Sequence, residues 1–172
     1  MAIDFTTLDL RDALDFAILI EEEARERYQS FTKIVGGRYA GDAADVFKLM
    51  VTYETKHGEQ LAARRRSLFK DAPRRVRMEM FDDVEAPDRS APRTFMSARD
   101  AMEVAIASEE KARDFFAAAL KQVKDPEVRA LFSELRAEEE EHRKLLAERL
   151  KKLPKGPDLT EADADEPGSD GG

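Results

Sequence analysis

The sequence predicts an all-α protein in which four long helices form two hairpins joined by one long crossover. Of the 172 residues, 38% are charged and 42% are hydrophobic, with only 8 glycines and 7 prolines. Such a mixture, rich in Ala, Leu, Glu, Lys and Arg, favours long helices over strands. An internal repeat and a long segment between its two copies define the expected topology.

The internal repeat consists of two pairs of similar segments. Residues 11–28 align without gaps with residues 99–116, and residues 47–57 align with residues 132–142. One segment of each pair lies in each half of the chain, in the same order. Each half is therefore expected to be a helical hairpin built on the same pattern.

Capping residues and helix breakers set the expected ends of the four helices. Gly36 and Gly37 end the first helix. Ser97 is a good N-cap for the third helix, and Asp125 followed by Pro126 is a favourable start for the fourth. The expected helices cover residues 8–35, 42–70, 98–124 and 126–153.

The segment between the two hairpins, residues 71–96, is long and contains three prolines. An up-down-up-down bundle needs only short loops, whereas a ferritin-like bundle joins its hairpins through a long crossover. We therefore expect a ferritin-like four-helix bundle over residues 1–153, with a short helix or strand at residues 76–81. Residues 154–172 are rich in Pro, Gly and acids, and are expected to be a disordered acidic tail.

Composition limits the classes of site and partner. Because Cys is absent, disulfides, iron–sulfur clusters, thiolate zinc sites and rubredoxin-type iron centres are excluded. The chain shows neither a secretory signal nor an apolar run long enough to span a bilayer, so a soluble, cytoplasmic protein is expected. The acidic tail supplies much of the net charge of −8, and no nucleic-acid partner is expected. A basic run from Arg64 to Arg77 is interpreted as a solvated helix end and loop, with docking to an anionic partner as the alternative.

In every expected helix, ionisable residues interrupt the apolar stripe. Leu14, Glu21 and Tyr28 are seven residues apart and therefore share one face of the first helix. The third helix repeats this spacing, and the second and fourth each carry a Glu-x-x-His motif on their stripe. The ionisable residues expected to point inward are Glu21, Glu54, His57, Glu109, Glu139 and His142.

Four buried carboxylates need compensation, because each charge is costly to desolvate and like charges repel in a low dielectric. Two divalent cations would cancel the four negative charges. Each Glu-x-x-His motif can supply one oxygen and one nitrogen from the same helix face. Oxygen-rich ligation with one imidazole per metal suits iron or manganese better than zinc or copper. The sequence therefore predicts a two-metal, di-iron site, with manganese as the alternative metal and a metal-free bundle as the alternative structure.

The remaining polar residues near this layer have simpler interpretations. The hydroxyl of Tyr28, if buried, needs a partner, and a ligand carboxylate from the opposite helix pair is one candidate. Core filling alone is the alternative role for Tyr28. Acids that fall off the apolar stripe are expected to face solvent: Glu22, Glu23, Glu26, Glu110, Glu138, Glu140 and Glu141.

Over residues 8–153 these motifs resemble the rubrerythrin branch of the ferritin-like superfamily. The resemblance rests on Glu21-x-x-Ala-Arg-x-Arg-Tyr28, Glu54-x-x-His57, Glu109 and Glu139-x-x-His142. It implies a di-iron site that reacts with hydrogen peroxide or dioxygen, with these four glutamates and two histidines as metal ligands. The sequence departs from the family in two respects. Ala112 stands where rubrerythrins usually carry a further Glu, and the usual rubredoxin domain is missing.

Three functions are compatible with this resemblance. The first is a redox enzyme of the peroxidase or ferroxidase type, which reduces peroxide or dioxygen with electrons from an external donor. The second is an iron-storage or iron-handling protein, and the third is a non-catalytic metal-binding module. We expect a homodimer or a higher homo-oligomer. No fifth helix follows residue 153, so an autonomous 24-subunit cage is not the expected assembly.

Overall fold

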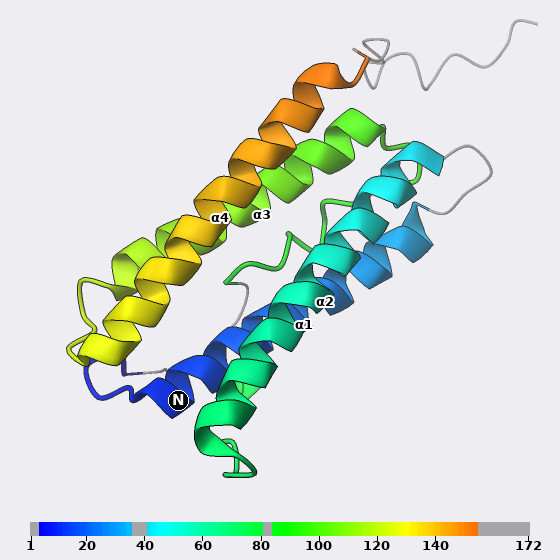
Figure 1. The fold of residues 1–172 in the computed structure, drawn as a ribbon. Helices are drawn as coiled ribbons and strands as arrows, with labels where there is room; N and C mark the ends of the chain where they lie inside the picture. Colours follow the sequence, from blue (N-terminus) through cyan, green and yellow to red (C-terminus); the bar gives the residue numbers. More distant parts are fainter. Residues whose placement is uncertain (1–3, 36–40, 81–83, 155–172) are drawn as a thin grey trace, which may run out of the picture.

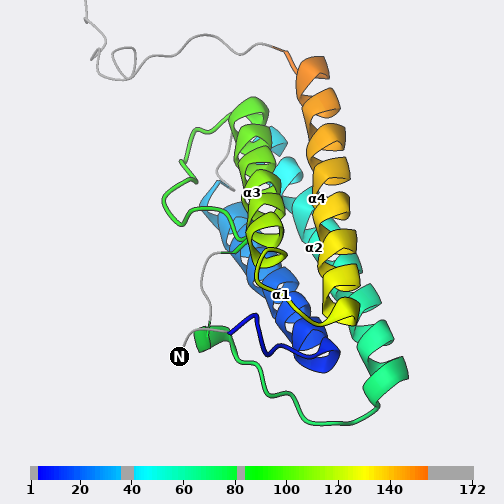
Figure 2. The ribbon, with the colours of Figure 1, turned by 90° about the vertical axis from the view of Figure 1, so that its left-hand side faces the viewer.

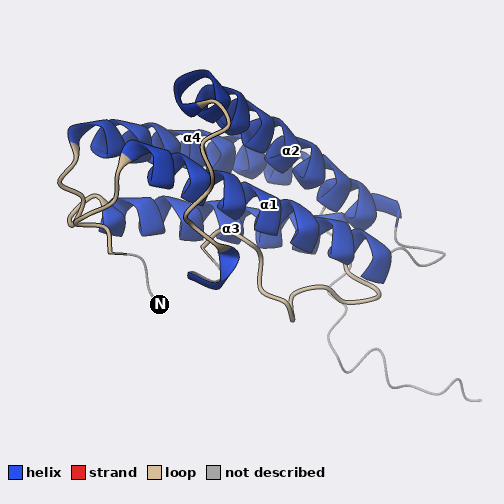
Figure 3. Ribbon diagram, turned by 90° about the horizontal axis from the view of Figure 1, so that it is seen from below, coloured by secondary structure: helices blue, strands red, loops and turns tan. Residues whose placement is uncertain are grey.

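The computed structural model describes residues 4–35, 41–80 and 84–154. They form the helices α1 (Leu10–Ile34), α2 (Gly41–Phe69), α3 (Ala98–Ala119) and α4 (Pro126–Lys152), and a short 3-10 helix, η1 (Met78–Met80). The described part of the chain contains no strand (Figure 3). The predicted all-α, ferritin-like class is confirmed. The segment expected to be a disordered tail, except Pro154, lies outside the described residues, as do the two glycines expected to end the first helix.

The four helices form two antiparallel hairpins, α1 with α2 and α3 with α4 (Figure 1). The hairpins contact each other mainly through α2 and α3, and less extensively through α1 and α4. The crossover leads from one end of the bundle back to the other, so that α2 and α3 run in the same direction (Figure 2). This is the long connection that the sequence predicted.

Side-chain caps explain where the helices begin. The carboxylate of Asp9 accepts a hydrogen bond from the backbone N–H of Asp12, so α1 starts slightly later than expected. Ser97 and Asp100 form a capping box at the start of α3. The carboxylate of Asp125 accepts from the first backbone N–H groups of α4, where Pro126 occupies the first turn. The sequence predicted the caps of α3 and α4 correctly, because each depends on local residues.

The third helix ends at Ala119, earlier than the expected residue 124. The guanidinium of Arg129 on α4 donates hydrogen bonds of 2.8 and 2.9 Å to the carbonyl oxygens of Leu120 and Val123. The side chain of Val123 is also buried in the core. The chain therefore turns inward after Ala119, because a contact with α4 satisfies carbonyl groups that a longer helix would otherwise use.

The apolar core consists of two clusters at opposite ends of the bundle. One cluster is rich in aromatic rings, with Phe5, Phe16, Phe116 and Phe132 in edge or tilted contacts. The other cluster surrounds Tyr28 and includes phenylalanine and methionine side chains from α1, α2, α3 and the end of the crossover, together with Leu146 of α4. The crossover contributes buried residues to both clusters. The layer between them holds the ionisable residues predicted to point inward.

Most of the basic run is exposed, as the sequence suggested, and Arg65 is the exception. Arg65 is 8% exposed and binds the carboxylate of Asp15, which is fully buried on α1. The same guanidinium donates to the carbonyl oxygen of Ala72 at 2.6 Å, so it connects α1 to the start of the crossover. Arg75 pairs with Asp12, and with Asp9 at the N-terminus of α1. Arg65 and Arg75 therefore attach the start of the crossover to α1 through ion pairs with its acidic residues.

None of the described helices is long and apolar enough to cross a membrane.

The pairing of Asp15 with Arg65 yields a stability prediction. Asp15→Ala should lower the free energy of unfolding by about 3–5 kcal/mol, because it leaves the Arg65 charge buried without its partner. Urea unfolding followed by circular dichroism measures this change. The control is Asp45→Ala, since Asp45 pairs with Lys48 on the exposed face of α2 and should matter little. Equal effects of the two substitutions would contradict the structural role of the buried pair.

Candidate metal centre

The four helices bring all six sequence-predicted residues into one layer between the two apolar clusters. Glu21 comes from α1, Glu54 and His57 from α2, Glu109 from α3, and Glu139 and His142 from α4. The four carboxylates are each at most 4% exposed. Helical periodicity positions them, because residues three, four or seven apart share a helix face.

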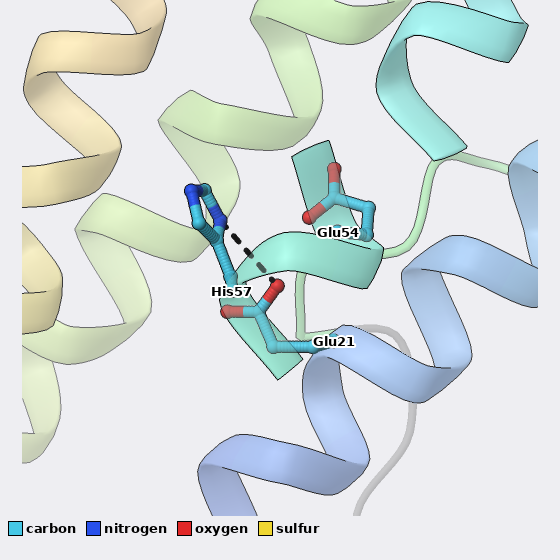
Figure 4. A group of neighbouring side chains, drawn as sticks. All are labelled: Glu21, Glu54 and His57. Carbon is cyan, nitrogen blue, oxygen red and sulfur yellow. Dashed lines mark ion pairs between the residues drawn. The ribbon is translucent and has the colours of Figure 1, made fainter. Parts of the chain in front are cut away.

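The first half of the chain forms one triad of potential ligands, Glu21, Glu54 and His57. One atom of each residue lies within 4.8 Å of the others. The Nδ1 atom of His57 is 3.7 Å from the carboxylate oxygen Oε2 of Glu21 (Figure 4). Glu54 points toward the same space from the next turn of α2 (Figure 4). Two oxygens and one nitrogen can thus reach a single cation.

The second half forms an equivalent triad, Glu109, Glu139 and His142, with one atom of each again within 4.8 Å of the others. The Nδ1 atom of His142 is 3.7 Å from Oε2 of Glu109 and 3.7 Å from Oε2 of Glu139. The distance from His142 to Glu109 matches that from His57 to Glu21 in the first half. The internal repeat of the sequence therefore produces two similar triads.

The two histidines meet where α2 lies beside α4. Their rings stack with centroids 4.4 Å apart and planes 12° apart. Their side chains are 17% and 18% exposed, which makes them the most accessible members of the triads. The two triads are therefore neighbours, and the histidines mark the side of the layer nearest to solvent.

A seventh residue, Glu85 of the crossover, lies in the same layer and was not predicted. It is 2% exposed, and its carboxylate lies with those of Glu21 and Glu139 in one group and with those of Glu54 and Glu109 in another. Helical periodicity could not reveal it, because residue 85 belongs to no helix. The available signal was weak: a single acid between Val84 and Ala86 in an otherwise polar loop.

The pKa values reflect the absence of compensating charge around these carboxyls. Burial raises the pKa of Glu85 and of Glu109 to about 8. Burial, reinforced by the neighbouring carboxylates, also holds the pKa values of Glu21 and Glu54 well above the usual range. The pKa of Glu139 is raised by burial in the same way. These carboxyls therefore bind protons more strongly than exposed glutamates do, and a metal cation would be attracted for the same reason.

The two histidines differ in their tendency to bind a proton. Burial, together with the nearby His142, lowers the pKa of His57 to about 4. Burial also disfavours the charged form of His142, but the carboxylate of Glu139 outweighs it and raises the pKa of His142. A neutral imidazole is the form that binds a metal, so His57 is in the ligand-competent state at neutral pH.

Four carboxylate oxygens of this layer lack the hydrogen bonds that buried polar groups normally have. The Oε2 atoms of Glu21, Glu85, Glu109 and Glu139 are buried and have no hydrogen-bond partner among the described residues. A buried oxygen without a partner costs free energy, and more so if it is charged. Coordination of cations would satisfy these atoms, and the oxygen-rich donor set with two imidazoles fits iron or manganese.

Tyr28 is buried beside this layer, and its ring packs against Phe31 and Phe47. Among the described residues, its hydroxyl makes no hydrogen bond to a ligand carboxylate. Burial, followed by the charges of Glu54 and Glu109, raises the pKa of Tyr28 well above its usual value. The sequence left two roles open for Tyr28, a hydrogen bond to a ligand carboxylate and core filling, and its packing against Phe31 and Phe47 favours core filling.

Among the acids expected to face solvent, Glu23 differs from the expectation. Its side chain is 12% exposed and pairs at 2.8 Å with the guanidinium of the buried Arg27. Arg27 also donates a hydrogen bond of 2.7 Å to the carbonyl oxygen of Pro87. Glu23 thus helps to hold the crossover against α1, a contact that the helical pattern alone did not indicate.

Comparisons with known proteins identify one similar solved structure and one matching protein family. The chain is similar to the crystal structure of an uncharacterised conserved protein from Magnetospirillum magnetotacticum MS-1, with 28% identity and a TM-score of 0.65. That similarity covers 89% of this chain and 100% of the other. No curated protein matched the chain. A sequence model of the rubrerythrin family matches residues 12–91 and 100–167. The chain therefore belongs to the rubrerythrin family.

Proposed function

We propose that this protein is a di-iron oxidoreductase that reduces hydrogen peroxide or dioxygen. The observation that carries the proposal is the pair of similar triads, in which buried carboxylate oxygens without hydrogen bonds lie beside imidazole nitrogens. Membership of the rubrerythrin family supports the choice of iron. The ligands would be Glu21, Glu54 and His57 for one ion, and Glu109, Glu139 and His142 for the other. Manganese remains the alternative metal, because the same donor set accepts it.

Two Fe(II) ions held by these residues would supply the two electrons that, together with two protons, reduce one hydrogen peroxide to two water molecules. The surrounding residues determine which small molecules can reach this site. The two apolar clusters exclude water from both ends of the layer. A cavity of about 200 Å³ between α2 and α4 reaches His57, which gives a small oxidant a path of approach. An external electron donor is required to return the iron to Fe(II), since the chain carries no second redox centre built from Cys.

The first test measures metal binding. Under anaerobic conditions the protein should bind two Fe(II) ions per chain and gain thermal stability, because the ions bind only the folded state. The variant Glu54→Ala, His57→Ala should lose at least one ion per chain and most of that gain. Glu59→Ala, on the exposed face of the same helix, is the matched control and should behave as the wild type. A wild-type chain that gains neither iron nor stability would indicate a non-metal role.

The second test measures the reaction. Anaerobic di-ferrous protein mixed with substoichiometric hydrogen peroxide should lose Fe(II) within seconds, as followed by stopped-flow absorbance. Two Fe(II) ions should be consumed per peroxide, because each supplies one electron. The absence of oxidation would overturn the proposal. If oxidation by dioxygen instead led to hundreds of irons per large particle in gel filtration, the storage function would replace the redox one.

A third prediction concerns pH and the metal-free protein. A carboxyl with a higher pKa in the folded than in the unfolded state binds more protons when folded, so stability falls as pH rises between these two values. The metal-free protein should therefore lose stability from about pH 4.5, the ordinary Glu value, to about pH 8. With Fe(II) or Mn(II) in excess the trend should reverse, since protons compete with the metal for the carboxylates. Urea midpoints measured across this range, with and without metal, test both trends, and a flat metal-free profile would contradict the first.

A further inference from the structure

Glu85 occupies a position that a loop acid seldom has. Its side chain is 2% exposed, and its flanking residues Val84 and Ala86 are buried as well. Its Oε2 atom has no hydrogen-bond partner among the described residues. Loops usually remain at the surface and leave their acids in water. A buried carboxylate without a partner needs a compensating group, and the crossover directs this one into the layer of triads.

The neighbours of Glu85 come from both halves of the bundle. Its carboxylate lies in one group with Glu21 and Glu139, and in another with Glu54 and Glu109, with ligand atoms in each group within 4.8 Å of one another. Each group takes one glutamate from the first triad and one from the second. Glu85 is thus near four carboxylates and lies between the two triads. A carboxylate has two oxygens, so it can serve two neighbouring cations.

Two cationic side chains fix the backbone just after Glu85. The ammonium group of Lys111 on α3 donates a hydrogen bond of 2.6 Å to the carbonyl oxygen of Ala86. The guanidinium of Arg27 on α1 donates to the carbonyl oxygen of Pro87 at 2.7 Å. The crossover is therefore held between α1 and α3, with the Glu85 carboxylate turned inward and its Oε2 atom without a hydrogen-bond partner among the described residues.

We propose that Glu85 is a seventh ligand, a carboxylate that the crossover places between the two cation positions. The proposal rests on the two-metal function proposed above. With Glu85, five carboxylates surround two divalent cations, so the layer keeps one net negative charge after both ions bind. This extra anionic oxygen donor strengthens the binding of both ions, whereas without metal it adds to the repulsion among the buried acids.

The test uses Glu85→Gln, which keeps the shape of the side chain and removes its charge. Mn(II), titrated calorimetrically into the metal-free full chain, is the probe. The dissociation constant for Mn(II) should rise by about tenfold or more relative to the wild type, because losing even an outer partner of a metal ligand costs about 10–100-fold in affinity. Glu79→Gln is the control, because Glu79 is an exposed acid of the same crossover and should leave Mn(II) binding unchanged.

Melting temperatures give a second, independent readout. Metal-free Glu85→Gln should melt at a higher temperature than the metal-free wild type, because a neutral amide replaces an ionisable carboxyl that is buried among four others. The increase in melting temperature on addition of Mn(II) should be smaller in the variant. A purely structural role in fixing the crossover predicts a lower melting temperature both with and without metal, which would overturn the proposal. If Glu85→Gln does not fold, Glu85→Asp carries the test, since its shorter reach should also weaken Mn(II) binding.

The outcomes separate this proposal from the one on which it depends. If wild type and Glu85→Gln both bind two Mn(II) ions with equal affinity, Glu85 is not a ligand and the two-metal function stands. If the wild type binds neither Mn(II) nor Fe(II), both proposals fail. Weaker binding by Glu85→Gln with an unchanged Glu79→Gln control supports the assignment.

Discussion

Repulsion among buried carboxylates is the constraint on which the rest of this structure depends. Glu21, Glu54, Glu85, Glu109 and Glu139 share one layer inside the bundle, and each is almost fully shielded from water. Burial and the neighbouring carboxyls raise their pKa values. Two cations bound at this layer, as proposed above, would offset the repulsion and stabilise the fold.

The surrounding structure is arranged to maintain this unfavourable layer. Apolar clusters on both sides contribute hydrophobic stabilisation that offsets the desolvation of the acids. Cationic side chains are placed next to the layer instead of inside it: Arg65 binds Asp15, and Lys111 and Arg27 bind backbone oxygens of the crossover. These three cations therefore stabilise the crossover and its contact with the helices.

The sequence predicted those parts of the site that follow helical periodicity. Glu21 and Glu109 could be identified because they lie on the apolar stripe, and the two Glu-x-x-His motifs because both their residues point the same way. Glu85 could not, since a loop has no period from which to infer the direction of a side chain. The end of α3 and the burial of Arg65 were missed for a similar reason. Both depend on contacts between distant segments, Arg129 with residues 120 and 123, and Arg65 with Asp15.

The position of Glu85 also bears on the symmetry of the centre. The repeat within the chain gives two triads with the same residue types and the same 3.7 Å contact between imidazole and helix glutamate. The crossover occurs only once in the chain. Glu85 therefore has no equivalent in the other half, and it breaks the symmetry of the two triads. Ala112 leaves the third helix without a further acid at the place where the family usually has one, and Glu85 is the acid that reaches the layer instead. A fifth carboxylate could therefore arise from a loop without disturbing either hairpin, because the crossover already passes along the bundle between α1 and α3.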